Sequence, residues 1–174
     1  ELEKHIGLIW LNRYRALFDD HCLLSHQLWD DEKSLGDWRR NKLHRLAQKA
    51  GIEEHFKDYR IRIGERLACR QADVVTDVNF EITSKSGSLL LSIQSGVLIP
   101  NTAFSKHASL DSVYCGLSAS DQFITLMTPN NLSSALALTS TMSSDLFDKI
   151  ELFSISRNYS MTERDQAPST KNHE

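Results

Sequence analysis

Two histidines and a cysteine near the start of the chain are the first residues whose types suggest chemistry. His21, Cys22 and His26 carry imidazole and thiol groups, which are common zinc ligands. On a helix, the four-residue spacing of Cys22 and His26 places both side chains on one face. A closed zinc site needs about four ligands, and no second Cys/His pair follows at a recognised distance. We therefore expect no metal ion and no other cofactor.

Two further spacings match catalytic patterns on a helix. His26 and Asp31 fit the H-x4-D spacing of some acyltransferases, but five residues of helix do not bring the two side chains to one face. Arg39 and His44 fit the R-x4-H spacing of helical HEPN-type ribonucleases, in which the pair activates a ribose hydroxyl and stabilises a phosphate. That fold is entirely helical, which conflicts with the β-rich pattern of residues 74–139.

Acidic and basic residues also alternate in the middle of the chain. Asp77, Glu81 and Lys85 suggest a metal-dependent nuclease, but the (Asp/Glu)-x-Lys unit of such enzymes is missing. The three residues are better explained as the solvated face of a hairpin. Neither a glycine-rich phosphate loop nor a G-x-S-x-G elbow is present. We therefore predict no catalytic residues and a protein that is not an enzyme.

A basic run between residues 39 and 49 supports an alternative function. If it forms one helix, the side chains present either a solvated face or a face that binds phosphate. Trp38 is the one aromatic residue next to these charges, and stacking on single-stranded nucleic acid uses several. A nucleic-acid-binding or regulatory domain is thus the second hypothesis, and an enzyme of unrecognised type is the third. The basic residues are Arg39, Arg40, Lys42, Arg45 and Lys49.

Apolar spacing predicts the elements of the first 51 residues. Residues 2–29 show alternating steps of four and three, typical of a long helix that packs on another helix. A second helix is predicted to begin near Ser34, with Asp37 completing a capping box, and to end at Gly51. The first helix packs either on its own domain or on a partner. The residues of this predicted docking seam are Trp10, Tyr14, Leu17, Leu24 and Leu28, with His21 among them.

A β-hairpin at residues 74–94 is the most clearly patterned element. Residues 74–83 alternate apolar and polar side chains, residues 84–87 form a turn, and residues 88–93 form the return strand. A four-residue loop sets the register, and the apolar partners then share one face of the hairpin. The predicted pairs are Ile82 with Leu89, Phe80 with Leu91 and Val78 with Ile93.

The remaining patterns predict an α+β fold. A short strand is expected at 97–99 before Pro100, a helix at 110–117, strands at 123–128 and 132–139, and a helix at 145–156. The predicted fold is an antiparallel, twisted sheet of about five strands with helices packed on it, plus an N-terminal helical segment. The predicted division is an N-terminal helical extension at 1–35, an α+β domain at 36–158 and a disordered tail at 159–174.

Composition restricts the location and the partners. The chain has 174 residues and a net charge of −3, which fits one domain without the basic excess of a dedicated nucleic-acid binder. No run approaches the roughly 20 apolar residues that span a bilayer, and the first residues do not form a secretory signal. The three cysteines are odd in number and far apart, which favours a reducing compartment. We therefore expect a cytoplasmic protein with no membrane partner.

The order of elements from residue 42 to residue 157 resembles the type III secretion chaperones of the Tir-chaperone class. The helical stretch at 42–52 ends in the Gly-hydrophobic pair Gly51-Ile52, and the apolar stretches 87–93 and 97–100 lead to a proline. A middle helix, two strands and a final helix are then similar in order and length. Residues 1–35 have no counterpart in that family.

This resemblance implies a non-enzymatic homodimer that holds an extended segment of a secreted effector by strand addition and apolar pockets. The partner would be a protein, with nucleic acid a weaker alternative. The partner-binding residues implied are Leu90, Val97, Leu98, Ile99, Leu136 and Leu138. The implied dimer interface, on the middle helix, consists of Leu110, Val113, Tyr114 and Leu117.

Overall fold

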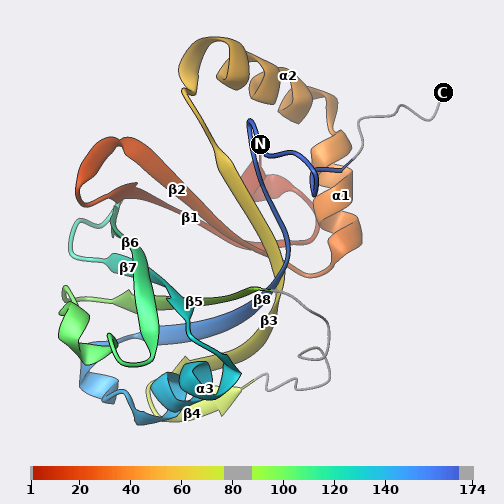
Figure 1. Ribbon diagram of the computed structural model, residues 1–174. Coiled ribbons are helices and arrows are strands. Elements are labelled where there is room, and N and C mark those ends of the chain that lie inside the picture. The colour runs from red at the N-terminus through yellow and green to blue at the C-terminus, as the bar shows by residue number, and fades with distance from the viewer. Residues whose placement is uncertain (1, 77–87, 169–174) are drawn as a thin grey trace.

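An eight-stranded antiparallel sheet organises the molecule (Figure 1). The structure is a computed structural model that describes residues 2–76 and 88–168. The strand order in the sheet is β2-β1-β6-β7-β5-β8-β3-β4. The strands are β1 (Leu8–Ala16), β2 (Asp19–Trp29), β3 (Arg60–Gln71), β4 (Val74–Thr76), β5 (Ser88–Ser95), β6 (Ala108–Gly116), β7 (Phe123–Pro129) and β8 (Lys149–Ser160).

Three α-helices accompany the sheet in the described part of the chain: α1 (Glu32–Arg40), α2 (Lys42–Ala50) and α3 (Leu132–Thr141). Short helical turns lie at Leu2–Lys4, Asn101–Ala103 and Ser144–Leu146, and a π-helical turn at Gly51–His55 follows α2. The predicted α+β class with an antiparallel sheet is therefore confirmed, although the sheet has more strands than expected.

One face of the central strands packs against α3. Leu91 and Ile93 of β5 and Ile150 and Leu152 of β8 are fully buried there. Leu91 lies directly opposite Leu152 in the ladder, and Ile93 lies opposite Ile150. Ala135 and Leu138 of α3 join the same apolar cluster, and Figure 1 shows α3 below these strands. Burial of each large side chain contributes roughly 1.5–3 kcal/mol, so this face holds most of the core.

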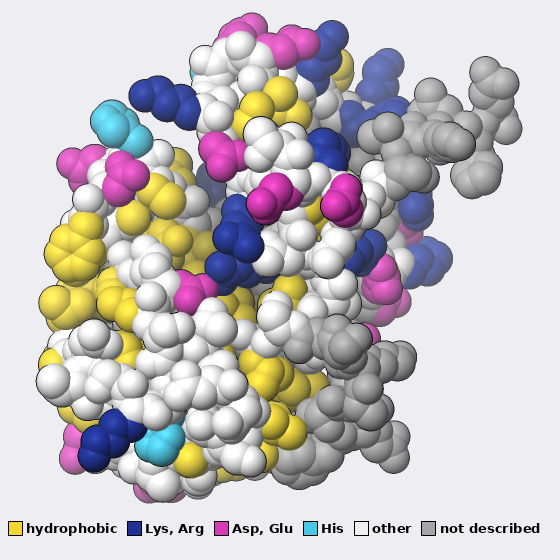
Figure 2. Space-filling model, in the orientation of Figure 1, with side chains coloured by type: hydrophobic (Ala, Val, Ile, Leu, Met, Phe, Trp, Pro, Cys, Tyr) yellow, Lys and Arg dark blue, Asp and Glu magenta, His cyan; other side chains and the backbone are white. Residues whose placement is uncertain are grey.

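The opposite face is covered by the β1–β2 hairpin. β1 pairs with β6 only from Tyr14↔Gly116 to Ala16↔Tyr114, so the rest of the hairpin is free to turn over the sheet. Tyr14 packs there against the buried side chains of Ile124 and Leu126. Exposed apolar side chains lie beside acidic ones at the outer end of the hairpin, as Figure 2 shows, and Phe18 there is 85% exposed. The sheet therefore has two covered faces, and the second is closed by its own N-terminal strands.

Residues 2–29 do not form the predicted helix; they form β1, a tight turn and β2. The apolar positions assigned to a helical seam are mostly even-numbered, which is also the spacing of one face of a strand. Trp10 lies opposite Leu28 and Tyr14 opposite Leu24, while Leu17 lies in the turn. The seam is therefore the inner face of a hairpin, and the boundaries predicted at residues 35 and 158 stay a prediction.

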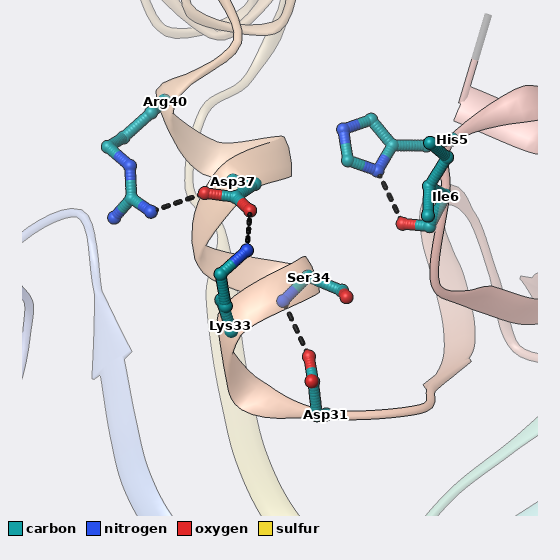
Figure 3. A network of polar contacts seen from close by, with 7 residues as sticks. All are labelled: His5, Ile6, Asp31, Lys33, Ser34, Asp37 and Arg40. Atoms are coloured by element: carbon teal, nitrogen blue, oxygen red, sulfur yellow. Dashed lines mark hydrogen bonds and ion pairs between the residues drawn. The ribbon is translucent and has the colours of Figure 1, made fainter.

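The helix near residue 34 starts two residues earlier than predicted, at Glu32. The N-cap is Asp31, whose carboxylate accepts a hydrogen bond from the Ser34 backbone N–H at 2.7 Å, so the predicted Ser34–Asp37 capping box is wrong. Asp37 instead accepts from Lys33 and Arg40 on the surface of α1 (Figure 3). Asn41 separates α1 from α2, so the predicted single helix is two helices, and it is the N-cap of α2. The α-helix ends at Ala50, close to the predicted end, but Gly51 is right-handed helical and the chain continues into the π-helical turn at Gly51–His55, so Gly51 is not the predicted stop.

Four predictions in the second half of the chain are wrong. Residues 110–117 lie mostly in strand β6, residues 132–139 in helix α3, and residues 145–156 in a short turn followed by β8. Asn131 accepts a hydrogen bond from the Ser134 backbone N–H and so caps the start of α3. The spacing of apolar residues does not reveal this capping signal. Residues 97–99 are not a strand, because β5 ends at Ser95.

The predicted hairpin register lies largely outside the described residues. Val78, Phe80 and Ile82 belong to residues 77–87, which the structure does not describe. The return strand is confirmed as β5. Leu91, however, pairs with Met127 of β7 and with Leu152 of β8. Because β7 and β8 occupy both sides of this strand, the pairings predicted for Leu91 and Ile93 are wrong.

The tail predicted at 159–174 begins inside strand β8. Tyr159 and Ser160 are its last residues, and the Ser160 hydroxyl accepts hydrogen bonds from the backbone N–H groups of Thr162 and Glu163. Arg164 donates to the Tyr59 hydroxyl at 2.7 Å. Residues 159–164 are therefore ordered, and residues 169–174 lie outside the described part.

Gly7 lies in the turn before β1 and against Ser34 of α1, and its substitution should destabilise the protein. Its φ is +87°, and a Cβ there would lie 2.3 Å from the Cβ of Ser34. We expect Gly7→Ala to lower the free energy of unfolding by about 2 kcal/mol in urea titrations. Gly96→Ala is the matched control, because nothing lies within 4 Å of a Cβ at Gly96. Equal stability of the two variants would contradict this account of the turn.

Candidate active site

A buried carboxylate lies at the centre of the sheet face that the hairpin covers. Glu151 of β8 is 0% exposed. Its Oε1 is 3.0 Å from a guanidinium nitrogen of Arg66 and 3.0 Å from the Lys149 ammonium. Gln94 of β5 donates to Oε2 at 3.5 Å. A charge removed from water is tolerated when it is paired and hydrogen-bonded. The two cations therefore stabilise the buried carboxylate of Glu151.

The hairpin places aromatic rings over this charged group. The Lys149 ammonium lies 4.7 Å from the centre of the Trp10 ring, a cation–π geometry. Trp10 meets His26 edge-on at 4.8 Å between ring centres, and His26 meets Phe153 edge-on at 6.0 Å. His26 is therefore held between an aromatic side chain of the hairpin and one of the central sheet.

His26 is a neutral histidine in this setting. Burial, opposed by the Glu151 carboxylate and assisted by the Lys149 ammonium, lowers the pKa of His26 from the usual 6.5 to about 4. Nδ1 of His26 is buried and has no hydrogen-bond partner among the described residues. Ser92 Oγ is in the same condition, and Ser92 lies directly opposite Glu151 in the ladder, hence on the same face.

This arrangement favours binding an organic molecule over transferring protons in bulk water. An imidazole with a pKa near 4 is a weak base at neutral pH. It can still donate or accept one hydrogen bond in a water-poor setting, where such bonds are strong. Trp10 and Phe153 supply apolar ring surfaces beside it. Unpartnered buried polar atoms beside aromatic rings are typical of a ligand site.

The lowered pKa of His26 should make folding stability depend on pH. The unfolded state binds a proton below about 6.5 and the folded state only below about 4, so stability is present above pH 6.5 and is lost as the pH falls through this window. We expect the wild type to lose about 2 kcal/mol more than His26→Gln between pH 7 and pH 4.5 in urea titrations. His21→Gln, at an exposed position of the same strand, should retain the wild-type profile. Parallel profiles for the wild type and His26→Gln would refute the account.

The predicted metal candidates do not come together. His21 and Cys22 are neighbours in strand β2 and so point to opposite faces. Cys22 and His26 share a face but stand about 13 Å apart along the strand. In the described part of the chain, no group of three or more His, Cys, Asp or Glu side chains lies close enough to hold a metal ion. All three cysteines are free.

The basic run is divided between two helices. Arg39 and Arg40 belong to α1, and the other three basic residues belong to α2. A cavity of about 280 Å³ borders α1, and Arg40 there is paired with Asp37. His44 stacks on Trp38 at 4.4 Å, and its pKa is lowered by partial burial and then by Arg39. The charges therefore do not form one continuous helical face.

The residues implied as partner-binding or dimer-forming are scattered, and their roles stay predictions. Ile99 and Leu138 are buried, Leu90 and Leu136 are half-buried, and Val97 and Leu98 are exposed. The four implied dimer residues lie in or just after strand β6 and not on a helix: Val113 is buried, Tyr114 is half-buried, and Leu110 and Leu117 are exposed.

Sequence reasoning assigned no role to Glu151, Lys149, Arg66 or Gln94, and it placed the first two in a helix. Lys149 and Glu151 alternate with Ile150 and Leu152, the period of a strand with one apolar face. That pattern assigns Glu151 to the opposite, solvated face, and only the hairpin that covers this face buries the carboxylate.

Comparisons with known proteins found a partial match to a curated protein and weak matches to two solved structures. No family model matches the chain. Over 78 residues, 45% of this chain and 36% of the relative, it is 36% identical to the jasmonate monooxygenase ABM of Pyricularia oryzae. The matched part is thus about a third of that curated relative's length.

Two solved structures are also similar. One is a candidate monooxygenase of Fusobacterium nucleatum subsp. nucleatum, with a TM-score of 0.35 and 8% identity, covering 91% of this chain and 80% of that one. The other is an anthrone oxidase-like protein, with a TM-score of 0.37 and 9% identity, covering 95% and 84%. Neither TM-score reaches 0.5, so neither structure carries an argument about function.

These findings correct the functional predictions. The resemblance to Tir-class secretion chaperones is wrong, because its middle helix, second strand and final helix are a strand, a helix and a strand here, and because the curated relative that matches part of the chain is a monooxygenase and not a chaperone. The prediction of a non-enzymatic protein-binding module and its nucleic-acid alternative are contradicted by the same similarity. No helix among the described residues is long and apolar enough to span a membrane.

Proposed function

We propose that this protein is a monooxygenase that acts on a small organic substrate. The observation that carries the proposal is the 36% identity to the jasmonate monooxygenase ABM over 78 residues. The geometry around His26 supports it, since a neutral imidazole with an unpartnered nitrogen lies between two aromatic rings. We call this group, made of Trp10, His26, Phe153, Lys149 and Glu151, the His26 site.

Each side chain of the site has a role in this proposal. Trp10 and Phe153 hold the apolar part of the substrate, and His26 Nδ1 forms a hydrogen bond to a substrate oxygen. Glu151 holds the Lys149 ammonium, and this ammonium fixes the position of the Trp10 ring. Because these groups are held by the sheet before substrate binds, the site is preorganised.

The proposed reaction has a defined balance. One atom of O2 enters the substrate and the other leaves as water, which consumes two electrons and two protons. The electrons come either from an added reductant such as NADPH or from the substrate itself when a CH2 group becomes a carbonyl. Both routes consume O2, so oxygen uptake detects either one.

An oxygen electrode tests the proposal. Purified protein is mixed with jasmonate, with and without NADPH, and O2 uptake is compared with that of protein heated until unfolded. We expect uptake that depends on folded protein and on jasmonate or a related small acid. Absence of uptake across a panel of apolar acids, ketones and phenols would overturn the proposal.

Two further properties are proposals of the same kind. The three free cysteines suit a reducing compartment, so we propose that the protein acts in the cytoplasm; fractionation of the native host with an antibody measures this. The predicted homodimer stays a prediction, which light scattering on the purified protein tests.

A further inference from the structure

A second cavity opens where strand β5 loses one of its neighbours. The pairing of β5 with β7 begins at Leu91↔Met127, and the cavity lies just beyond it with a volume of about 160 Å³. Its walls combine apolar side chains with a polar rim that includes two arginines. The lining residues are Leu89, Leu90, Ile155, Arg60, Arg62, Ser88, Thr128 and Asn158.

Arg60 provides a positioned cation at the rim. Its Nε donates a hydrogen bond to Asn158 Oδ1 at 2.8 Å, which fixes the plane of the guanidinium. Among the described residues no carboxylate forms an ion pair with Arg60, and its two terminal amino groups have no hydrogen-bond partner. An arginine in this state offers a planar fork, the geometry that binds a carboxylate with two bonds.

The second arginine is already neutralised. Arg62 donates to Asp111 Oδ2 at 2.8 Å, and the Thr128 hydroxyl donates to Asp111 Oδ1 at 2.8 Å. This ion pair gives the cavity no net charge of its own, so the positive charge at the rim is that of Arg60. A ligand that complements the cavity has one negative charge at the rim and an apolar part inside.

Leu90 connects the cavity with the His26 site. Leu90 packs against the Tyr14, Ile124 and Leu126 cluster under the hairpin, and it lies directly opposite Phe153 in the ladder between β5 and β8. Phe153 in turn contacts His26. Leu90 and Phe153 therefore form a row of neighbouring apolar side chains between the cavity and the imidazole.

We propose that this cavity binds the carboxylate end of a small apolar carboxylic acid, with Arg60 as the anion-binding residue. The assignment of that acid as the substrate rests on the proposed monooxygenase function, whereas binding of the acid does not. Drug-sized ligands occupy cavities of roughly 300–1,000 Å³, so about 160 Å³ suits a short acid or the acid end of a longer one. An alcohol of the same length lacks the charge that Arg60 recognises.

Calorimetry with matched probes tests the inference without turnover. Hexanoate and 1-hexanol are titrated into the intact protein under nitrogen and without reductant. We expect hexanoate to bind roughly tenfold or more tightly than hexanol, and Arg60→Gln to lose that preference. Arg60→Lys, which keeps the charge without the fork, should retain part of it. Arg45→Gln, at an exposed position of α2, is the matched control and should bind like the wild type.

The outcomes separate this inference from the proposed function. Equal binding of acid and alcohol, no binding of either, or unchanged hexanoate binding by folded Arg60→Gln would overturn the inference. Circular dichroism establishes that each variant is folded. Hexanoate binding through Arg60 in a protein that consumes no O2 with any substrate would refute the monooxygenase proposal alone. Oxygenation of jasmonate with the same KM in the wild type and Arg60→Gln would refute the cavity assignment alone.

Discussion

His26→Phe is expected to lower kcat for oxygenation of the substrate roughly a hundredfold while leaving the fold intact. Phenylalanine keeps the flat ring that packs between Trp10 and Phe153, but it removes the unpartnered nitrogen of the imidazole. A hydrogen bond that strengthens in the transition state contributes to kcat more than to KM. The measurement is a steady-state oxygen-uptake assay that determines the two constants separately.

His21→Phe is the matched control for this variant. His21 lies five residues earlier on the same strand and is exposed, so kcat and KM should stay within about twofold of the wild type. A folded His26→Phe protein with wild-type kcat would remove His26 from the chemistry. A change confined to KM would assign it a role in binding alone.

Glu151→Ala is expected to lower the free energy of unfolding by about 3 kcal/mol. The substitution leaves the Arg66 and Lys149 cations without the carboxylate that both contact at 3.0 Å. Breaking a buried ion pair by removing one partner typically costs 3–5 kcal/mol. The lower end applies here, because the side chains of Arg66 and Lys149 are 25% and 15% exposed. Urea titration followed by tryptophan fluorescence measures the change.

Two further variants show whether charge pairing causes this loss. Glu65→Ala removes an exposed carboxylate from strand β3 and should change stability by at most about 0.5 kcal/mol. Combining Lys149→Leu with Glu151→Leu should recover part of the loss, because apolar replacements of a buried pair are often nearly neutral. A Glu151→Ala protein within 1 kcal/mol of the wild type would show that the buried carboxylate is not held by its cations.

Local patterns predicted part of the fold. The α+β class, strands β5 and β7 and helix α2 all follow from short-range periodicity. The errors arose where one pattern fits two structures. Trp10, Tyr14, Leu24 and Leu28 repeat at intervals that suit both a helix and one face of a strand.

The second half of the chain was ambiguous for a related reason. Residues 132–141 contain no charged side chain, so neither the helical period nor the strand period separates a solvated face from an apolar one. The N-cap at Asn131 is the local signal that indicates a helix. Residues 149–160 form a strand buried by its neighbours β3 and β5. Such tertiary contacts override local propensity.

The candidate site was not predictable from local spacing. Arg66 and Glu151 are 85 residues apart along the chain and 3.0 Å apart in space. His26 meets Phe153 only because the hairpin turns over the sheet. A pattern search that treated His26 as a helical neighbour of Cys22 or Asp31 had no means of finding these contacts, since they depend on the strand order.

Labelled oxygen provides the most direct measurement of the central claim, that the protein inserts oxygen at the His26 site. The wild type and His26→Phe are incubated with jasmonate and NADPH under ¹⁸O2, and the product is analysed by mass spectrometry. We expect one ¹⁸O atom in the product of the wild type and roughly a hundredfold less labelled product with His26→Phe. Product without ¹⁸O, or equal labelling by both proteins, would contradict this claim.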